Sequence, residues 1–227
     1  MSKINFQKDM LIQVASALNE LLPQVVFIGG CTTGLFLTDD FTKEQVRYTD
    51  DVDLIVHVGS YFDWTQLAER LRQLGFRESM DEEVICTMML GQLKVDFMPD
   101  NADILGFSNR WYRDAMTTAR DFALTEALTI KLVEPVYFVA TKLEAYLGRG
   151  NGDALSSHDI EDLINIFDGR EEIVVEINAV DGELRAFIRV QLQALLDDAN
   201  FEYAIQSATG NNGQRESLIF ERIEACL

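Results

Sequence analysis

Two aspartates open a stretch of the chain that otherwise has the pattern of a buried β-strand. Asp51 and Asp53 begin the run Asp-Val-Asp-Leu-Ile-Val-His-Val, which ends before Gly59. Successive side chains on a strand point to opposite faces, so these two carboxylates lie on the same face. Like charges this close repel each other unless a cation lies between them. Magnesium takes oxygen ligands and also binds substrate phosphates, so a metal site is one interpretation and a solvated strand end is the other.

An earlier strand pattern ends in two glycines. The run Val25–Ile28 is short and apolar, as in a buried strand, and Gly29 and Gly30 follow it before a helix predicted from Thr32 to Leu37. Glycines let a ligand approach the backbone closely, and the N–H groups at a helix start can bind phosphate oxygens. A plain turn has the same pattern, so the glycines alone predict no function.

A third carboxylate interrupts another strand-like stretch. Asp96 lies in Leu-Lys-Val-Asp-Phe-Met, and the runs 84–90 and 93–98 around a Gly-Gln pair predict a β-hairpin. Burying a carboxylate is costly unless it is paired or bound to a metal. If this strand lies beside that of Asp51 and Asp53, three carboxylates converge on a site for two divalent ions. Asp96 could also act as general base for an attacking hydroxyl.

The rest of the chain is predicted to be mostly helical. We therefore expect an α+β fold, with a small mixed sheet and flanking helices over residues 1–130. A mostly helical C-terminal lobe packed on this core is expected over residues 131–227. The expected helices cover 6–21, 63–74, 108–119, 135–147 and 159–167, with two or three more in 172–227; a strand or two is expected in 122–133 and a polar loop over 38–47.

Charge and cysteine content restrict the partners and the compartment. The formal net charge is −19, and an acidic surface repels nucleic-acid phosphates, which argues against broad nucleic-acid binding but leaves room for a local basic patch. Cys31, Cys86 and Cys226 lack the spacing of a zinc site or a disulfide framework. We see no signal peptide and no membrane-spanning run, so we expect a cytoplasmic protein without a membrane partner.

Taken together, the first strand, its glycines and the Asp-x-Asp strand resemble the polymerase-β-like nucleotidyltransferases. The pattern of that superfamily is an apolar strand, Gly-Gly or Gly-Ser, and then Asp-apolar-Asp-apolar. Here these are Ile28-Gly29-Gly30 and Asp51-Val52-Asp53-Leu54. The gap between the two motifs is longer than in the superfamily pattern, and we assign the extra length to the polar segment 38–47.

Three later features are similar to the AbiEii/AbiGii toxin-type family within this superfamily. They are the run Arg47-Tyr48-Thr49-Asp50-Asp51-Val52-Asp53, the pair Lys142 and Arg149, and the helical Asp159-x-x-Asp162. The resemblance spans roughly residues 24–170. It implies an enzyme dependent on Mg²⁺ or Mn²⁺ that moves a nucleoside monophosphate from a nucleoside triphosphate to an acceptor hydroxyl and releases pyrophosphate.

The resemblance also implies a role for each matching residue. Aspartates would bind the metal and carry catalysis, glycines would hold the nucleotide phosphates, and a lysine would neutralise the triphosphate. The implied metal ligands are Asp51, Asp53 and Asp96; the implied catalytic residues are these three and Asp159; the implied nucleotide-binding residues are Gly29, Gly30, Thr33, Arg47, Lys142 and Arg149, with His158 and Asp162 as further candidates.

Ordinary structural roles stay open for three of these residues. Lys142 can be a solvated helix lysine, and His158 can be a capping or core histidine. Asp162 can stabilise a helix N-terminus through the helix dipole. The family pattern places a basic residue where this chain has His158, whose charge at neutral pH depends on its surroundings.

The resemblance predicts the toxin of a toxin–antitoxin or phage-defence system. Its acceptor would be RNA, tRNA in particular, or a protein, and its partner a cognate antitoxin. A small-molecule acceptor, as in antibiotic-modifying relatives, stays open. So does a non-catalytic interaction module on the same fold, and a kinase-like activity, which would release a nucleoside diphosphate in place of pyrophosphate.

Overall fold

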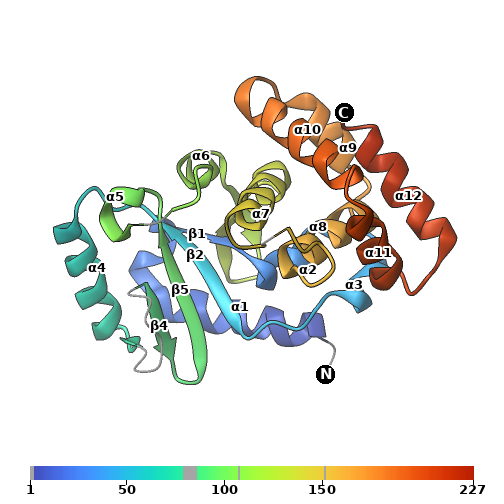
Figure 1. Ribbon diagram of the computed structural model, residues 1–227. Coiled ribbons are helices and arrows are strands. Elements are labelled where there is room, and N and C mark those ends of the chain that lie inside the picture. The colour runs from blue at the N-terminus through green and yellow to red at the C-terminus, as the bar shows by residue number, and fades with distance from the viewer. Residues whose placement is uncertain (1–2, 79–85, 107, 151) are drawn as a thin grey trace. The chain divides into compact units, whose positions relative to one another are not determined.

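The computed structural model describes residues 3–78, 86–106, 108–150 and 152–227, and it has the α+β architecture that the sequence predicts (Figure 1). Its residue contacts divide the chain into two compact units. The first comprises Met1–Thr32 and Tyr48–Glu134, and the second comprises Thr33–Arg47 and Pro135–Leu227. The predicted division lay near residue 130 and kept residues 33–47 with the sheet; the observed one follows Glu134 and assigns those residues to the second unit.

A mixed sheet of seven strands forms the centre of the first unit, as far as the chain is described. Its strands are β1 (Val25–Ile28), β2 (Asp51–Val56), β3 (Arg77–Glu78), β4 (Thr87–Leu90), β5 (Leu93–Pro99), β6 (Arg120–Ala123) and β7 (Thr129–Leu132). Their order in the sheet is β3-β4-β5-β2-β1-β7-β6. β2 is antiparallel to β1 and parallel to β5, so the strand of the two aspartates lies between the glycine-ended strand and the strand of Asp96.

The strand signals in the sequence correspond to the inner strands of this sheet. All four residues of β1 are buried, as expected for a short apolar run with neighbours on both sides. In β2, Val52 and Leu54 are buried while Asp51 and Asp53 are partly exposed, which is the alternation that places both aspartates on one face. β4 and β5 pair as the predicted hairpin. The first residues of the predicted run 84–90 lie outside the described part of the chain.

The helices of the first unit start and end at places that the sequence predicts only in part. They are α1 (Lys3–Leu18), the 3₁₀ turns η1 (Asn19–Gln24) and η2 (Gly30–Thr32), α4 (Tyr61–Gln73), α5 (Ala102–Leu105) and α6 (Tyr112–Thr118). The helix expected from residue 63 begins at Tyr61, and Ser60 caps it, because its hydroxyl accepts from the Asp63 N–H. Ser108 was expected to start a helix, but its hydroxyl donates to the Pro99 carbonyl at 2.9 Å and α6 begins at Tyr112.

The second unit is helical. Its elements are α2 (Thr33–Phe36), α3 (Asp40–Gln45), α7 (Pro135–Arg149), α8 (His158–Gly169), α9 (Ile173–Ala179), α10 (Gly182–Leu196), α11 (Ala199–Ala208) and α12 (Gly213–Glu224). α8 forms the core, because ten of its residues are buried and α3, α7, α11 and α12 all pack on it. Residues 172–227 hold four helices, one more than the largest number predicted. No helix among the described residues is long and apolar enough to cross a bilayer.

The segment 38–47 is not the polar loop that its composition predicts. Asp39 caps α3 by accepting from the Thr42 N–H at 2.8 Å. The backbone N–H groups of Thr38 and Asp39 both donate to the Gly169 carbonyl at the end of α8, at 2.8 and 3.0 Å. The polar residues of this segment therefore form hydrogen bonds within the second unit. A hydropathy pattern cannot distinguish polar residues that are bound in this way from polar residues that face solvent.

Candidate metal centre

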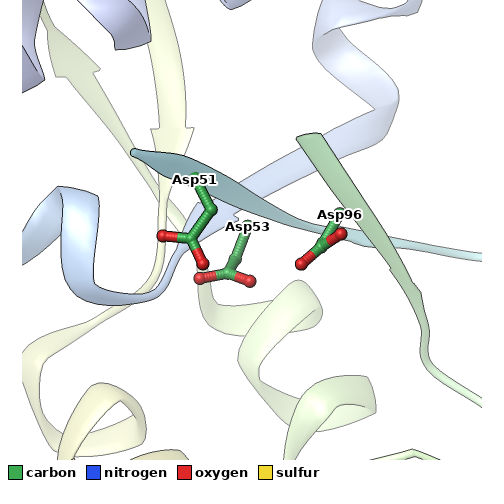
Figure 2. A group of neighbouring side chains, drawn as sticks. All are labelled: Asp51, Asp53 and Asp96. Atoms are coloured by element: carbon green, nitrogen blue, oxygen red, sulfur yellow. The ribbon is translucent and has the colours of Figure 1, made fainter. Parts of the chain in front are cut away.

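Three carboxylates meet on one face of the sheet (Figure 2). Asp51 and Asp53 come from β2 and Asp96 from β5, and the parallel register of these strands places Asp53 directly opposite Asp96. One carboxylate oxygen from each residue lies within 4.8 Å of the others, and all three side chains are partly exposed. No other group of three His, Cys, Asp or Glu side chains in the described part of the chain meets this criterion. The sequence prediction that these aspartates converge is therefore confirmed.

The Asp53 side chain leaves no room for a side chain at Gly29. Its φ is +81°, a left-handed conformation that glycine adopts without strain. A Cβ at this position would overlap the Asp53 carboxylate. The turn is closed by Thr32, whose N–H and hydroxyl both bind the Gly29 carbonyl, at 3.0 and 2.8 Å. The structure therefore gives Gly29 a role beside a candidate metal ligand, in addition to the phosphate contact that the resemblance implies.

Two threonines hold the other two carboxylates. The Thr49 hydroxyl donates to Oδ1 of Asp51. The Thr87 hydroxyl donates to Oδ1 of Asp96 at 2.6 Å. Both threonines are buried, with 5% and 3% of their surface exposed. Two of the three aspartates thus accept from a threonine hydroxyl, and Asp53 lies against Gly29.

A cysteine lies near this group but adds no charge to it. Cys86 is buried, and burial raises the pKa of its thiol to about 12, with the negative charges of Asp96 and Asp53 adding to the rise. The thiol is therefore protonated at neutral pH. The donor set consists of carboxylate oxygens, which are the ligands that Mg²⁺ and Mn²⁺ prefer, so the residues present fit such an ion.

The other predicted site residues form a second cluster, within the second unit. Lys142 of α7 lies between two aspartates of α8, with Nζ at 3.2 Å from Asp159 and at 2.6 Å from Asp162. Lys142 is 6% exposed, so the alternative of a solvated helix lysine is wrong. A charge buried to this extent needs partners, and the two carboxylates supply them.

Asp159 is held by two cations. Arg149 forms a two-pronged contact with it, at 2.9 Å through Nε and 2.8 Å through the terminal nitrogen. Burial alone would raise the pKa of Asp159, but the hydrogen bonds and charges of Arg149 and Lys142 outweigh it and lower the pKa below its usual value. Asp159 is therefore ionised at neutral pH.

Asp162 is the centre of this cluster. It is fully buried and accepts from Arg47 at 3.2 and 3.3 Å and from the Thr33 hydroxyl at 3.2 Å, in addition to the Lys142 contact. The helix-dipole role left open for Asp162 does not account for these four contacts.

His158 is neither a core residue nor a helix cap. Its side chain is 74% exposed, and the Ser157 hydroxyl caps α8.

The predicted residues thus fall into two clusters, one in each unit. Gly29, Asp51, Asp53 and Asp96 meet in the first unit, where Gly30 is also buried at the start of η2. The second cluster comprises Thr33, Arg47, Lys142, Arg149, Asp159 and Asp162. Sequence reasoning missed Thr87, which carries no motif. The signal that finds it is the hairpin register, which pairs it with Asp96.

No protein-family model matches the chain, and no curated protein matches it.

Proposed function

We propose that this protein is a metal-dependent nucleotidyltransferase, which transfers a nucleoside monophosphate from a nucleoside triphosphate to an acceptor hydroxyl. The observation that supports this most is the convergence of Asp51, Asp53 and Asp96 on two adjacent parallel strands. Like charges are placed side by side here at a cost in stability, which a bound divalent cation would offset. The resemblance assigns a phosphate contact to Gly29, whose turn lies beside the Asp53 carboxylate.

In the proposed reaction the acceptor oxygen attacks the α-phosphorus, and the bond from the α-phosphorus to the bridging oxygen breaks. Asp51, Asp53 and Asp96 would hold two Mg²⁺ or Mn²⁺ ions. These ions would stabilise the charge on the attacking and leaving oxygens. Asp96, at the β5 side of the group, would alternatively take the proton of the acceptor hydroxyl. Pyrophosphate leaves, and the remaining residues act by positioning and electrostatics.

The cluster in the second unit offers positive charge for an anionic ligand. It brings three cations, Lys142, Arg149 and Arg47, into contact with two carboxylates in a chain of net charge −19. Arg149 has a side chain that is 71% exposed. This exposed guanidinium supports a contact with an anion within the second unit, whereas Lys142, to which the resemblance assigns the triphosphate, is buried between Asp159 and Asp162.

The acceptor is proposed from the resemblance alone. RNA, particularly tRNA, or a protein would receive the nucleotide, in the setting of a toxin with its cognate antitoxin. A small antibiotic-like acceptor is the alternative within the same chemistry. The reaction products separate these enzymes from a kinase, because only nucleotidyl transfer releases pyrophosphate.

The first test is magnesium-dependent binding of the four nucleoside triphosphates by calorimetry. The variant Asp51→Asn, Asp53→Asn keeps the shape of the two side chains and removes their charge. The matched control is Asp103→Asn, Asp114→Asn, which removes two exposed carboxylates elsewhere in the same unit. We expect wild type and control to bind a nucleotide in the presence of Mg²⁺ and the site variant to lose this binding. Well-folded wild type that binds none of the four nucleotides would contradict the proposal.

A further inference from the structure

Three side chains form a row across three strands of the sheet. Thr87 of β4 is paired with Asp96 of β5, and Asp96 is paired with Asp53 of β2. Paired residues of neighbouring strands present their side chains on the same face. β5 lies between β4 and β2, so Thr87 and Asp53 flank Asp96 from opposite sides. The hydroxyl therefore approaches Asp96 from the side away from the other carboxylates.

The contact fixes one oxygen of Asp96. Thr87 donates to Oδ1 at 2.6 Å, a short distance within the range for a hydroxyl that donates to a carboxylate. The threonine is 3% exposed and β-branched, so its hydroxyl has few orientations available. One oxygen of Asp96 extends toward Asp53 in Figure 2. With Oδ1 held by Thr87, Oδ2 is the oxygen that this geometry assigns to the centre of the group.

We propose that Thr87 is a positioning residue that makes Asp96 a one-oxygen ligand of the metal centre. This inference rests on the proposed function, because it needs an ion bound by the three aspartates. Removing the donor takes away one hydrogen bond that orients Asp96, so this bond no longer opposes the repulsion from Asp53. Partners that orient a metal-binding side chain commonly contribute 10- to 100-fold in metal affinity or activity, and Thr87 fits that role.

The test measures Mn²⁺ binding by electron paramagnetic resonance, on the intact protein and without any substrate. Thr87→Val keeps the shape and β-branching and removes only the donor. Thr87→Ser keeps the donor. We expect Thr87→Val to weaken Mn²⁺ binding roughly tenfold or more, and Thr87→Ser to stay within about threefold of wild type. The serine variant also guards against a fold defect caused by any change at this position.

A second buried threonine serves as the control. Thr209 is 8% exposed and donates to the Ile205 carbonyl at 2.9 Å, so Thr209→Val loses a buried hydroxyl whose acceptor lies within the second unit. It should bind Mn²⁺ as wild type does. Unchanged binding by Thr87→Val, or equal losses in its valine and serine variants, would overturn the inference and leave the proposed function intact. Wild type that binds no Mn²⁺ through Asp51 and Asp53 would contradict both.

Discussion

At Gly29, the backbone conformation and a neighbouring side chain both favour glycine over any other residue. Two separate constraints act there: a left-handed backbone and the Asp53 carboxylate in the space a Cβ would fill. A glycine elsewhere in the same unit isolates the first constraint. Gly75 has φ +95°, and a Cβ there would meet nothing within 4 Å. Comparing the two positions separates backbone strain from damage to the metal centre.

Gly29→Ala and Gly75→Ala should both lose stability, but only the first should lose metal binding. A left-handed non-glycine residue costs roughly 1–2 kcal/mol, so urea unfolding should show a loss of that order for each variant. In Gly29→Ala the added methyl group must also displace Asp53, and Mn²⁺ affinity should fall at least about tenfold by analogy with other changes around metal ligands. Equal Mn²⁺ affinity in the two variants would show that Asp53 does not need the space at Gly29.

Lys142 and Arg149 give a contrast between a buried and an exposed partner of the same carboxylate. Both contact Asp159, but the side chain of Lys142 is 7% exposed and that of Arg149 is 71% exposed. Removing one member of a buried ion pair leaves an uncompensated charge and costs about 3–5 kcal/mol, whereas exposed pairs contribute about 0–1 kcal/mol. We expect Lys142→Met to lower the free energy of unfolding severalfold more than Arg149→Met, measured by urea unfolding. Similar losses in both variants would argue against a structural role for the buried contact.

At the scale of elements, the N-terminus of α3 is capped by Asp39. Asp39 accepts from the Thr42 N–H and hydroxyl, both at 2.8 Å, and pairs with Arg215 of α12 at 2.7 Å. Although partial burial opposes it, these contacts lower the pKa of Asp39 from 3.8 to about 2. A lowered carboxyl pKa contributes stability above pH 3.8, which is lost as the pH falls toward 2.

Asp39→Asn should therefore differ from wild type in a pH-dependent way. Thermal unfolding should show wild type as the more stable protein near pH 6, with the difference shrinking between about pH 4 and pH 2 as Asp39 protonates. The neighbouring Asp40→Asn is the control, because the Asp40 side chain is 95% exposed and pairs with Lys43 of the same helix. A difference between wild type and Asp39→Asn that is constant over this pH range would contradict the role given to the Asp39 charge.

The elements that the sequence predicts well are those whose pattern is local. The buried run of β1, the alternation in β2 and the glycine between β4 and β5 depend on neighbouring residues only. α3 was missed because its polar residues find partners far along the chain, such as Thr42 with Asp168 at 2.8 Å. The start of α6 was misplaced because Ser108 binds a carbonyl of β5. Neither partner is visible in a local window of sequence.

At the scale of the whole molecule, the aspartates of the candidate site could be predicted from the sequence. The threonines that donate hydrogen bonds to them could be predicted less well. The carboxylates come from two strands, and they meet because β2 and β5 are parallel neighbours whose register pairs Asp53 with Asp96. The sequence placed the division near residue 130, close to Glu134, but it did not place Thr33–Arg47 in the helical unit, because that segment joins it through contacts with α8 more than 100 residues later. That segment separates the Gly29 turn from Asp51 in sequence, although both belong to the first unit.

The most direct test of the central claim follows the phosphates of a labelled nucleoside triphosphate. The protein is incubated with Mg²⁺, with RNA or protein fractions as acceptors, and with triphosphates labelled at the α- or the γ-phosphate. The account predicts that α-label becomes attached to an acceptor, that γ-label leaves as pyrophosphate, and that Asp51→Asn, Asp53→Asn abolishes both. Transfer of the γ-label, or no transfer to any acceptor by well-folded protein that binds the nucleotide, would contradict nucleotidyl transfer.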